Sequence, residues 1–230
     1  MSVILVFLLV IFGIAGWWLS QQGLMSRPWL ETGAGAVEPT GMPTAKVGLG
    51  VFLAVVGCLF ALFASAYFMR MELADWRAMP LPRLVWLNTG MLVLGSVALQ
   101  SARVAARAGQ IDTARLGLAT GGVAGFAFLT GQVMAWRELV AAGYVVDGNP
   151  ADSFFYLLTG VHGLHIMGGL VALGWTMSAA WSVSRSDRLP LRAELCAMYA
   201  HFLLFVWLGI LVLLAGWASD VIEICRQLLT

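Results

Sequence analysis

Long apolar stretches separated by short polar segments set the pattern of this chain. Each stretch is long enough to cross a hydrocarbon layer of about 30 Å at about 1.5 Å per residue, so each predicts a membrane-spanning helix. The six stretches are residues 1–19, 45–69, 84–102, 116–136, 154–181 and 194–217. The pattern therefore predicts an all-α integral membrane protein built as a six-helix bundle.

The first stretch has the length of either a cleaved secretion signal or a retained span. A signal has a basic segment ahead of its apolar core and small residues at its cleavage site. Here no Lys or Arg precedes Arg27, and the stretch ends in Trp17 and Trp18, which suit a membrane interface. We therefore expect a retained span and a Gly/Pro-rich loop, residues 1–44, followed by a five-helix part, residues 45–230.

The fifth stretch, residues 154–181, carries two histidines on one side of the predicted helix. Residues spaced to share that side at about 100° per residue are Phe155, Leu158, His162, His165, Gly169, Leu173 and Thr176. An imidazole that faces lipid costs free energy, so His162 and His165 should face protein. This helix is therefore expected to pack inside the bundle.

Glycines mark two helices for close packing. Gly117, Gly121 and Gly125 follow one another at spacing four in the fourth stretch, a pattern that lets membrane helices approach closely. The fifth stretch has four glycines with the same expected role, Gly160, Gly163, Gly168 and Gly169. We expect both helices to contact their neighbours at these positions.

The composition agrees with a membrane protein. The chain of 230 residues is 60% hydrophobic and only 11% charged, whereas soluble domains carry about 25% charged residues. Its net charge of +1 gives no reason to expect a nucleic-acid partner or an acidic substrate. The three cysteines are far apart, so neither a disulfide framework nor a thiolate metal site is indicated.

The basic residues are distributed unequally between the two sides of the predicted bundle. One side holds eight of them, Arg27, Lys46, Arg103, Arg107, Arg115, Arg185, Arg188 and Arg192. The other side holds Arg70, Arg77, Arg83, Arg137 and Arg226. Because short loops rich in Lys and Arg stay in the cytoplasm, we expect both termini on the periplasmic side of a bacterial plasma membrane. In this arrangement 103–115 is a tight basic loop.

The three histidines are the strongest metal-ligand candidates. His162 and His165 share a helix face, but His201 should lie several ångströms nearer the inner surface than His165, which argues against one shared metal. Structural histidines that bond nearby polar groups are the simpler interpretation, and a metal or haem site is the alternative. Glu194 shares a face with His201, so it is either a solvated or capping carboxylate or part of a bracing Glu194–His201 network.

Two motifs give the chain a family resemblance. The segment FFYLLTGVHGLHIMGGL resembles the signature FFxxTGxHGxHVxxG of subunit III of haem-copper cytochrome oxidases. The segment ELCAMYAHFLLFVWL is similar to the family's E-x4-Y-W-H-F-x-D-x-x-W. The motif positions in this chain are His162, Gly163, His165, Gly169, Glu194, Tyr199, His201 and Trp207. The likeness extends over about residues 46–217.

The resemblance implies a role as well as a fold. The family's subunit binds neither haem nor copper itself; these belong to its partners, the oxidase subunits I and II. It holds phospholipid and supports assembly and sustained turnover of an enzyme that reduces O2 and pumps protons. A lipid-filled cleft is then expected between the N-terminal span and the five-helix part. Candidate lipid contacts are Arg103, Arg185, Trp17 and Trp18.

The chain departs from the family at its intramembrane carboxylates. Val56 and Leu204 stand where the family has a glutamate and an aspartate, and Ala135 replaces a further glutamate. Ala200 replaces the tryptophan that precedes the histidine. A proton-handling role at these positions is therefore not expected. The alternatives are an accessory subunit of a quinol oxidase or nitric oxide reductase, a small membrane haem or metal protein that uses the three histidines, and a transporter.

Overall fold

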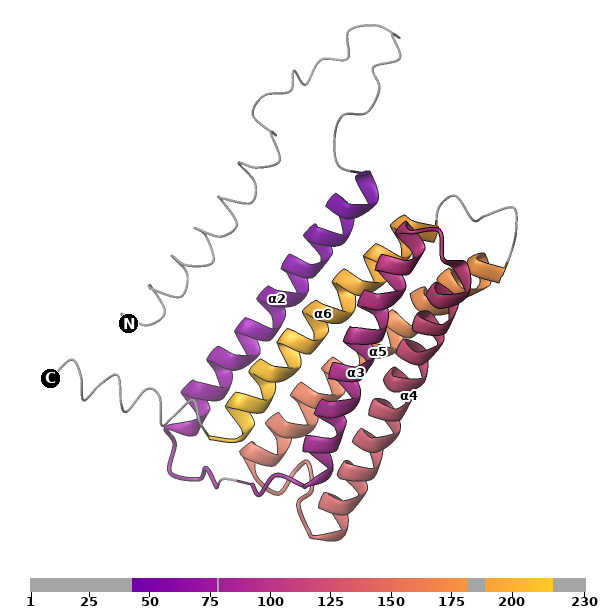
Figure 1. Ribbon diagram of the computed structural model, residues 1–230. Coiled ribbons are helices and arrows are strands. Elements are labelled where there is room, and N and C mark those ends of the chain that lie inside the picture. Colours follow the sequence, from indigo (N-terminus) through magenta and orange to yellow (C-terminus); the bar gives the residue numbers. More distant parts are fainter. Residues whose placement is uncertain (1–42, 78, 182–188, 217–230) are drawn as a thin grey trace, which may run out of the picture. The chain divides into compact units, whose positions relative to one another are not determined.

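Five long antiparallel helices make up the part of the chain that the computed structural model describes, which is residues 43–77, 79–181 and 189–216 (Figure 1). They are α2 (Thr44–Met71), α3 (Leu84–Arg107), α4 (Ile111–Ala141), α5 (Pro150–Trp181) and α6 (Leu189–Leu214). Each is long and apolar enough to cross a membrane, so the protein is a multi-pass membrane protein. The first predicted span lies outside the described residues.

Each described helix begins or ends beyond the apolar stretch that predicted it at one end or both, although α6 ends at Leu214, before the predicted end at residue 217. The expected basic loop 103–115 is wrong, because Arg103 and Arg107 belong to α3 and α4 already begins at Ile111. The expected positions of the other five spans, those within the described residues, are otherwise confirmed. Long arginine side chains allow this extension, since they can lie along the helix and reach water from its last turns.

The contact between α3 and α4 is the tightest in the bundle. A β-carbon placed on Gly117 would lie 2.7 Å from the carbonyl oxygen of Ala98, and one placed on Gly121 would lie 2.7 Å from the Leu99 side chain. The third glycine of this series, Gly125, faces α5, where Leu170 would be 2.9 Å away. Close packing at the spaced glycines is thus confirmed. It uses two sides of α4.

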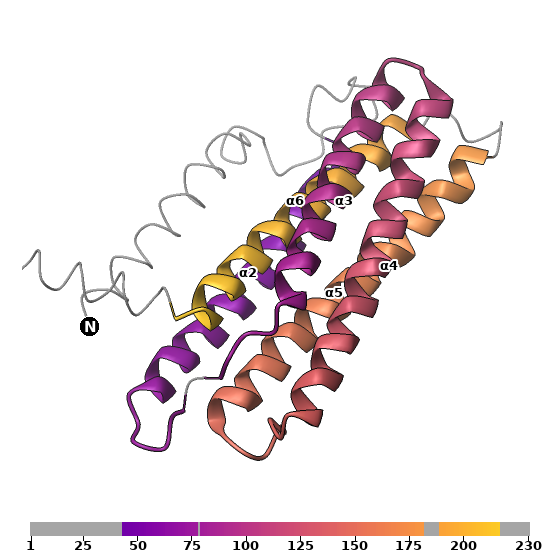
Figure 2. The ribbon, with the colours of Figure 1, turned by 60° about the horizontal axis from the view of Figure 1, so that its bottom comes forward.

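The predicted stripe of α5 is also confirmed. Phe155, Leu158, Leu173 and Thr176 are buried, and His162 is completely enclosed. The close contact expected at the α5 glycines is confirmed at Gly169, which is pressed against Tyr199, but is wrong at Gly168, where an added β-carbon would meet open space. The open space at Gly168 belongs to a cavity that is described below. Figure 2 shows α5 and α4 side by side along their length.

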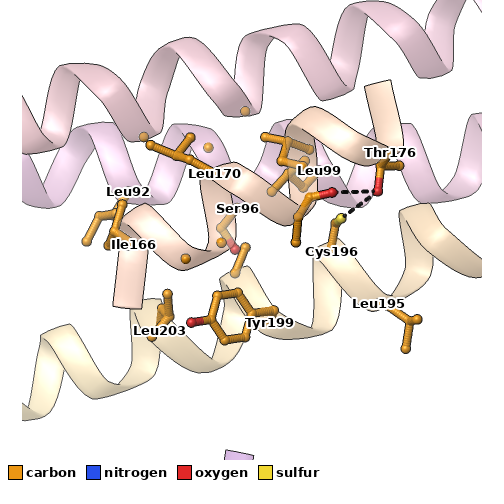
Figure 3. Close-up of a pocket in the computed structure, with 18 of the residues that line it drawn as sticks. Leu92, Ser96, Leu99, Ile166, Leu170, Thr176, Leu195, Cys196, Tyr199 and Leu203 are labelled. Atoms are coloured by element: carbon orange, nitrogen blue, oxygen red, sulfur yellow. Dashed lines mark hydrogen bonds between the residues drawn. The ribbon is translucent and has the colours of Figure 1, made fainter. Parts of the chain in front are cut away.

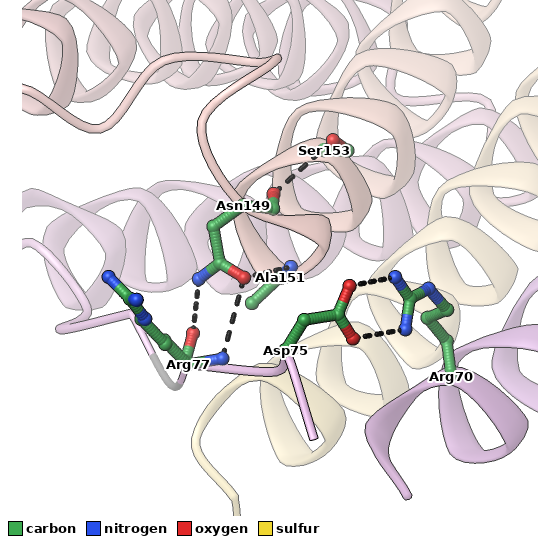
Figure 4. Close-up of polar contacts among 6 residues, drawn as sticks. All are labelled: Arg70, Asp75, Arg77, Asn149, Ala151 and Ser153. Atoms are coloured by element: carbon green, nitrogen blue, oxygen red, sulfur yellow. Dashed lines mark hydrogen bonds and ion pairs between the residues drawn. The ribbon is translucent and has the colours of Figure 1, made fainter. Parts of the chain in front are cut away.

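A polar clasp joins two connections at one end of the bundle (Figure 4). The side chain of Asn149, just before α5, accepts a hydrogen bond from the Arg77 backbone N–H at 3.4 Å and donates one to the Arg77 carbonyl at 2.5 Å. The same carboxamide oxygen accepts from the N–H of Ala151 at 3.4 Å. Nearby, Arg70 forms a two-pronged ion pair with Asp75 and holds the pKa of that carboxyl below its usual range. The α2–α3 connection is thereby tied to the start of α5.

Candidate functional site

His162 lies in an aromatic cage at the centre of the bundle. Its ring is 5.2 Å from the Trp207 ring, 5.6 Å from that of Phe128 and 6.3 Å from that of Phe60, measured between centroids. Neither imidazole nitrogen has a hydrogen-bond partner among the described residues. Trp207 instead donates its indole N–H to Thr89 at 2.9 Å. The motif residues His162 and Trp207 are therefore packed against each other and joined by no hydrogen bond.

His165, Gly169 and Tyr199 form a second contact between α5 and α6. The Tyr199 hydroxyl donates a hydrogen bond of 2.8 Å to the carbonyl of His165. The tyrosine ring fits there because Gly169 has no side chain: a β-carbon would lie 2.7 Å from the ring. His165 itself bonds the Val161 carbonyl at 2.8 Å through Nδ1. Gly163, the remaining motif glycine of α5, faces Leu129 of α4.

His201 does not join the other histidines. Its side chain is exposed, and its Nδ1 bonds the Ala197 carbonyl of its own helix. His201 therefore does not form the bracing network with Glu194 that was one of two alternatives for that carboxylate: the carbonyl one turn back along the helix is nearer than the carboxylate two turns back. Within residues 43–77, 79–181 and 189–216, no group of three or more His, Cys, Asp or Glu side chains is arranged to hold a metal ion.

Glu194 is neither solvated nor a simple cap, because three cations surround it. Its carboxylate lies 2.9 Å from the Lys46 ammonium, 2.7 Å from Arg107 and 3.2 Å from Arg103. Only 10% of the Glu194 side chain is exposed. The start of α2, the end of α3 and the start of α6 meet here, at the same end of the bundle (Figure 1). We call these four residues the charge cluster.

The charge cluster brings together residues for which the sequence pattern predicts no mutual contact. The sequence does contain a signal for this cluster. Lys46, Arg103 and Arg107 are all expected on one side of the membrane, and Glu194 begins the last predicted span on that same side. Arg103, a candidate lipid contact, is bound to Glu194. The other candidate lipid contacts, Arg185, Trp17 and Trp18, lie outside the described residues.

A cavity of about 440 Å³ lies between the helices and is lined by residues of all five described helices (Figure 3). Its wall is mostly apolar, with Leu92 and Leu99 from α3, Leu170 from α5 and Leu203 from α6. Thr176 and Cys196 also line it, their oxygen and sulfur atoms 3.4 Å apart. The small residues of α3 to α6 that line it leave this space, whereas close helix contact was the only role expected for the glycines of α4 and α5.

Comparison with known proteins gives this arrangement a family context. Residues 41–219 match the family model described as Cytochrome c oxidase subunit III. The chain is 28% identical over 170 residues to a protein of Nocardia farcinica named as a probable cytochrome c oxidase subunit 3, which covers 72% of this chain and 84% of the relative. It is 28% identical over 127 residues to "Cytochrome c oxidase subunit 3" of Corynebacterium diphtheriae, covering 54% and 60%.

A relative from a different kind of oxidase is almost as similar. "Cytochrome bo(3) ubiquinol oxidase subunit 3" of Pseudomonas aeruginosa is 27% identical over 124 residues, which covers 54% of this chain and 59% of the relative. The matched part spans about 60% of this relative and of the corynebacterial one. The similarity therefore includes proteins named for two different electron donors.

Proposed function

This chain belongs to the cytochrome c oxidase subunit III family, as a subunit III of a haem-copper oxidase, and we propose that its complex reduces O2 with electrons from cytochrome c and pumps protons. The match to the family over residues 41–219 carries this proposal. It includes all five described helices and both sequence motifs. The corresponding location is a bacterial plasma membrane.

Within that complex, we propose that the chain is a structural subunit without a redox centre of its own. It would pack against the oxidase subunits I and II, bind phospholipid and protect the catalytic subunit during sustained turnover. Two observations support this. The motif histidine His162 is fully buried and packed against the aromatic rings of Trp207 and Phe128, and α2 and α5 present large apolar side chains outward, such as Leu62 and Val171.

The test is a comparison of the complex with and without this chain. We expect the depleted complex to start with near-normal O2 consumption but to lose activity faster per turnover than the complete one. Adding the purified chain back should restore the slower loss. An identical rate of inactivation in the two preparations would contradict the proposed protective role while leaving the family membership untouched.

A quinol oxidase is the second candidate complex, and the similarity to the Pseudomonas protein favours it. The proteins that co-purify with the chain decide between the two. A partner with a dinuclear copper domain, together with oxidation of reduced cytochrome c, supports the first proposal. A partner that lacks this domain and oxidises quinol supports the second. Reduction of nitric oxide by the purified complex would instead support the alternative of a nitric oxide reductase.

A membrane haem or metal protein is the alternative from another class. His201 is turned to its own helix and exposed, so the three histidines do not share a site. An optical spectrum of the isolated chain tests this alternative directly. A Soret band, or a metal bound in a fixed ratio to the chain, would support it against the proposal of a structural subunit.

A further inference from the structure

The two parts of α2 are attached to the bundle in different ways. All three buried residues of this helix lie in its second part, and they are Val56, Phe60 and Tyr67. The Phe60 ring is 5.7 Å from the His165 ring, and the Tyr67 ring is 4.9 Å from the Trp76 ring, measured between centroids. The second part of α2 is therefore anchored by the packing of large side chains.

The first part of α2, residues 44–55, has no buried side chain. Leu49 and Phe52 are its contribution to the wall of the cavity. Phe52 contacts the Tyr199 ring at 6.3 Å between centroids but remains 47% exposed, and an added β-carbon on Gly48 would meet nothing within 4 Å. Packing therefore holds this segment only weakly. We call residues 44–55 the flap.

An ion pair fixes the start of the flap. The Lys46 ammonium lies 2.9 Å from Oε2 of Glu194, at the start of α6. Within the described residues, no other side-chain hydrogen bond or ion pair joins the flap to another helix. Arg103 and Arg107 contact the other carboxylate oxygen, Oε1, at 3.2 and 2.7 Å. Glu194 keeps these two partners when Lys46 leaves, so the flap can open without stranding an unpaired carboxylate.

Gly57 lies where the flap meets the anchored part of α2. Glycine weakens a helix relative to alanine, so a helix bends more readily there. Close packing does not require glycine at this position, because an added β-carbon would lie 3.8 Å from the Phe202 ring, an ordinary contact distance. Its neighbour Val56 is buried. The position of Gly57 is therefore that of a hinge.

From these observations we propose that the flap moves about Gly57 to open the cavity, and that the ion pair between Lys46 and Glu194 holds it closed. The two side chains are 22% and 10% exposed, so water and salt screen the pair. Loss of such a pair shifts the ratio of open to closed forms by about fivefold. The proposal concerns a movement within this chain, so it does not depend on which oxidase the chain serves.

Cys196 makes the opening measurable. Its thiol lines the cavity, whereas Cys58 on α2 is exposed and does not belong to the lining. In the full chain within its complex, both thiols are alkylated with N-ethylmaleimide and followed by peptide mass spectrometry. The ratio of the Cys196 rate to the Cys58 rate then reports access to the cavity, because changes in detergent or reagent affect both rates.

Substitutions at Lys46 test the ion pair. Lys46→Met removes the charge but keeps a long side chain, and it should raise the alkylation ratio about fivefold. Lys46→Arg keeps the charge and should leave the ratio unchanged. Arg70→Met is the matched control, since it breaks the ion pair with Asp75 at the other end of the same helix and should have no effect. Salt at 1 M should raise the ratio in the unchanged chain but not in Lys46→Met.

A substitution at Gly57 tests the hinge. Gly57→Ala stiffens the helix without a steric clash, so it should lower the alkylation ratio by about half. Gly90→Ala on α3 is its control, because an added β-carbon there would also meet no obstacle. The control should leave the ratio unchanged, since it stiffens a helix outside the flap.

A distance measurement keeps the proposal testable if Cys196 reacts in no variant. In a chain with its native cysteines replaced by serine, Ala45→Cys and Ala108→Cys carry spin labels at two exposed positions, one on the flap and one in the α3–α4 connection. Lys46→Met should add a population at longer distance. Arg70→Met should leave the distance distribution as it is.

Three results would overturn the proposal. These are an unchanged alkylation ratio and distance distribution in Lys46→Met, an equal effect of Arg70→Met, or an unchanged ratio in Gly57→Ala. A failure here leaves the oxidase proposal intact, because that proposal is tested by co-purification and turnover.

Discussion

His162 and Glu194 show two opposite ways of placing a polar side chain in an apolar bundle. His162 is enclosed by aromatic rings and has no hydrogen-bond partner among the described residues, so it contributes to stability through the packing of its ring. Glu194 is held by three cations, so its charge is what the structure uses. Substitutions that keep shape or charge should therefore have different effects at the two positions.

At His162 we predict that shape decides. His162→Leu should change the free energy of unfolding by no more than about 1 kcal/mol, because an apolar side chain of similar volume replaces a buried polar group without partners. His162→Ala should cost about 3 kcal/mol through the cavity it leaves. Denaturation of the purified chain with SDS measures both values. Equal losses in the two variants would show that the imidazole nitrogens are needed.

At Glu194 we predict that charge decides. Glu194→Gln keeps the shape but leaves Lys46, Arg103 and Arg107 close together without a carboxylate. We expect this to lower the free energy of unfolding, measured by SDS denaturation, by about 2 kcal/mol. The partial exposure of the cations limits the loss. Glu138→Gln, at an exposed position of α4, is the control and should change stability by less than about 0.5 kcal/mol. Because salt screens repulsion between exposed cations, high salt should reduce the difference in unfolding free energy between Glu194→Gln and Glu138→Gln. An unchanged difference would show that repulsion among the cations is not its cause.

At the scale of the helices, periodicity in the sequence was enough to place the spans and the buried side of α5. Phe155, His162 and Thr176 are buried as their spacing predicts. The ends of the helices were not predictable in the same way, because Arg103 and Arg107 are compatible with both a loop and a last helical turn. Contacts between distant helices, such as Lys46 with Glu194, depend on the tertiary arrangement, which no local pattern contains.

The packing of α3 against α4 gives a prediction at this scale. Gly117→Ala would place a β-carbon against the Ala98 backbone, which cannot move without shifting α3, so we expect a loss of about 2 kcal/mol in SDS denaturation. Gly90→Ala is the matched control, since nothing lies within 4 Å of its added β-carbon. That change should be neutral or stabilise the helix by up to about 1 kcal/mol. Similar results at both glycines would contradict close helix contact at Gly117.

At the scale of the whole molecule, the charge cluster, Arg192 and the α3–α4 connection lie at one end, and the Asn149 clasp lies at the other. We propose that the first end faces the cytoplasm. The family membership of the chain and the positions of its helices are the same for either orientation in the membrane.

Cysteine labelling in intact cells tests this orientation. In a chain with Cys58, Cys196 and Cys225 replaced by serine, Asp147→Cys lies in the α4–α5 connection and Ala108→Cys in the α3–α4 connection. A membrane-impermeant thiol reagent should label the cysteine at 147 in intact cells and the one at 108 only after the membrane is opened. Labelling in the reverse order would invert the proposed topology.

The Asn149 clasp also sets an order of events during synthesis. Its two hydrogen bonds join residues 72 positions apart, so neither can form until the second partner has left the ribosome. At about 5 to 20 residues per second, the Arg77 backbone waits about 4 to 14 seconds for Asn149. In that interval the ribosome synthesises α3 and α4, which lie between the two partners in the sequence. The two hydrogen bonds between Asn149 and Arg77 can therefore form only after α3 and α4 have been synthesised.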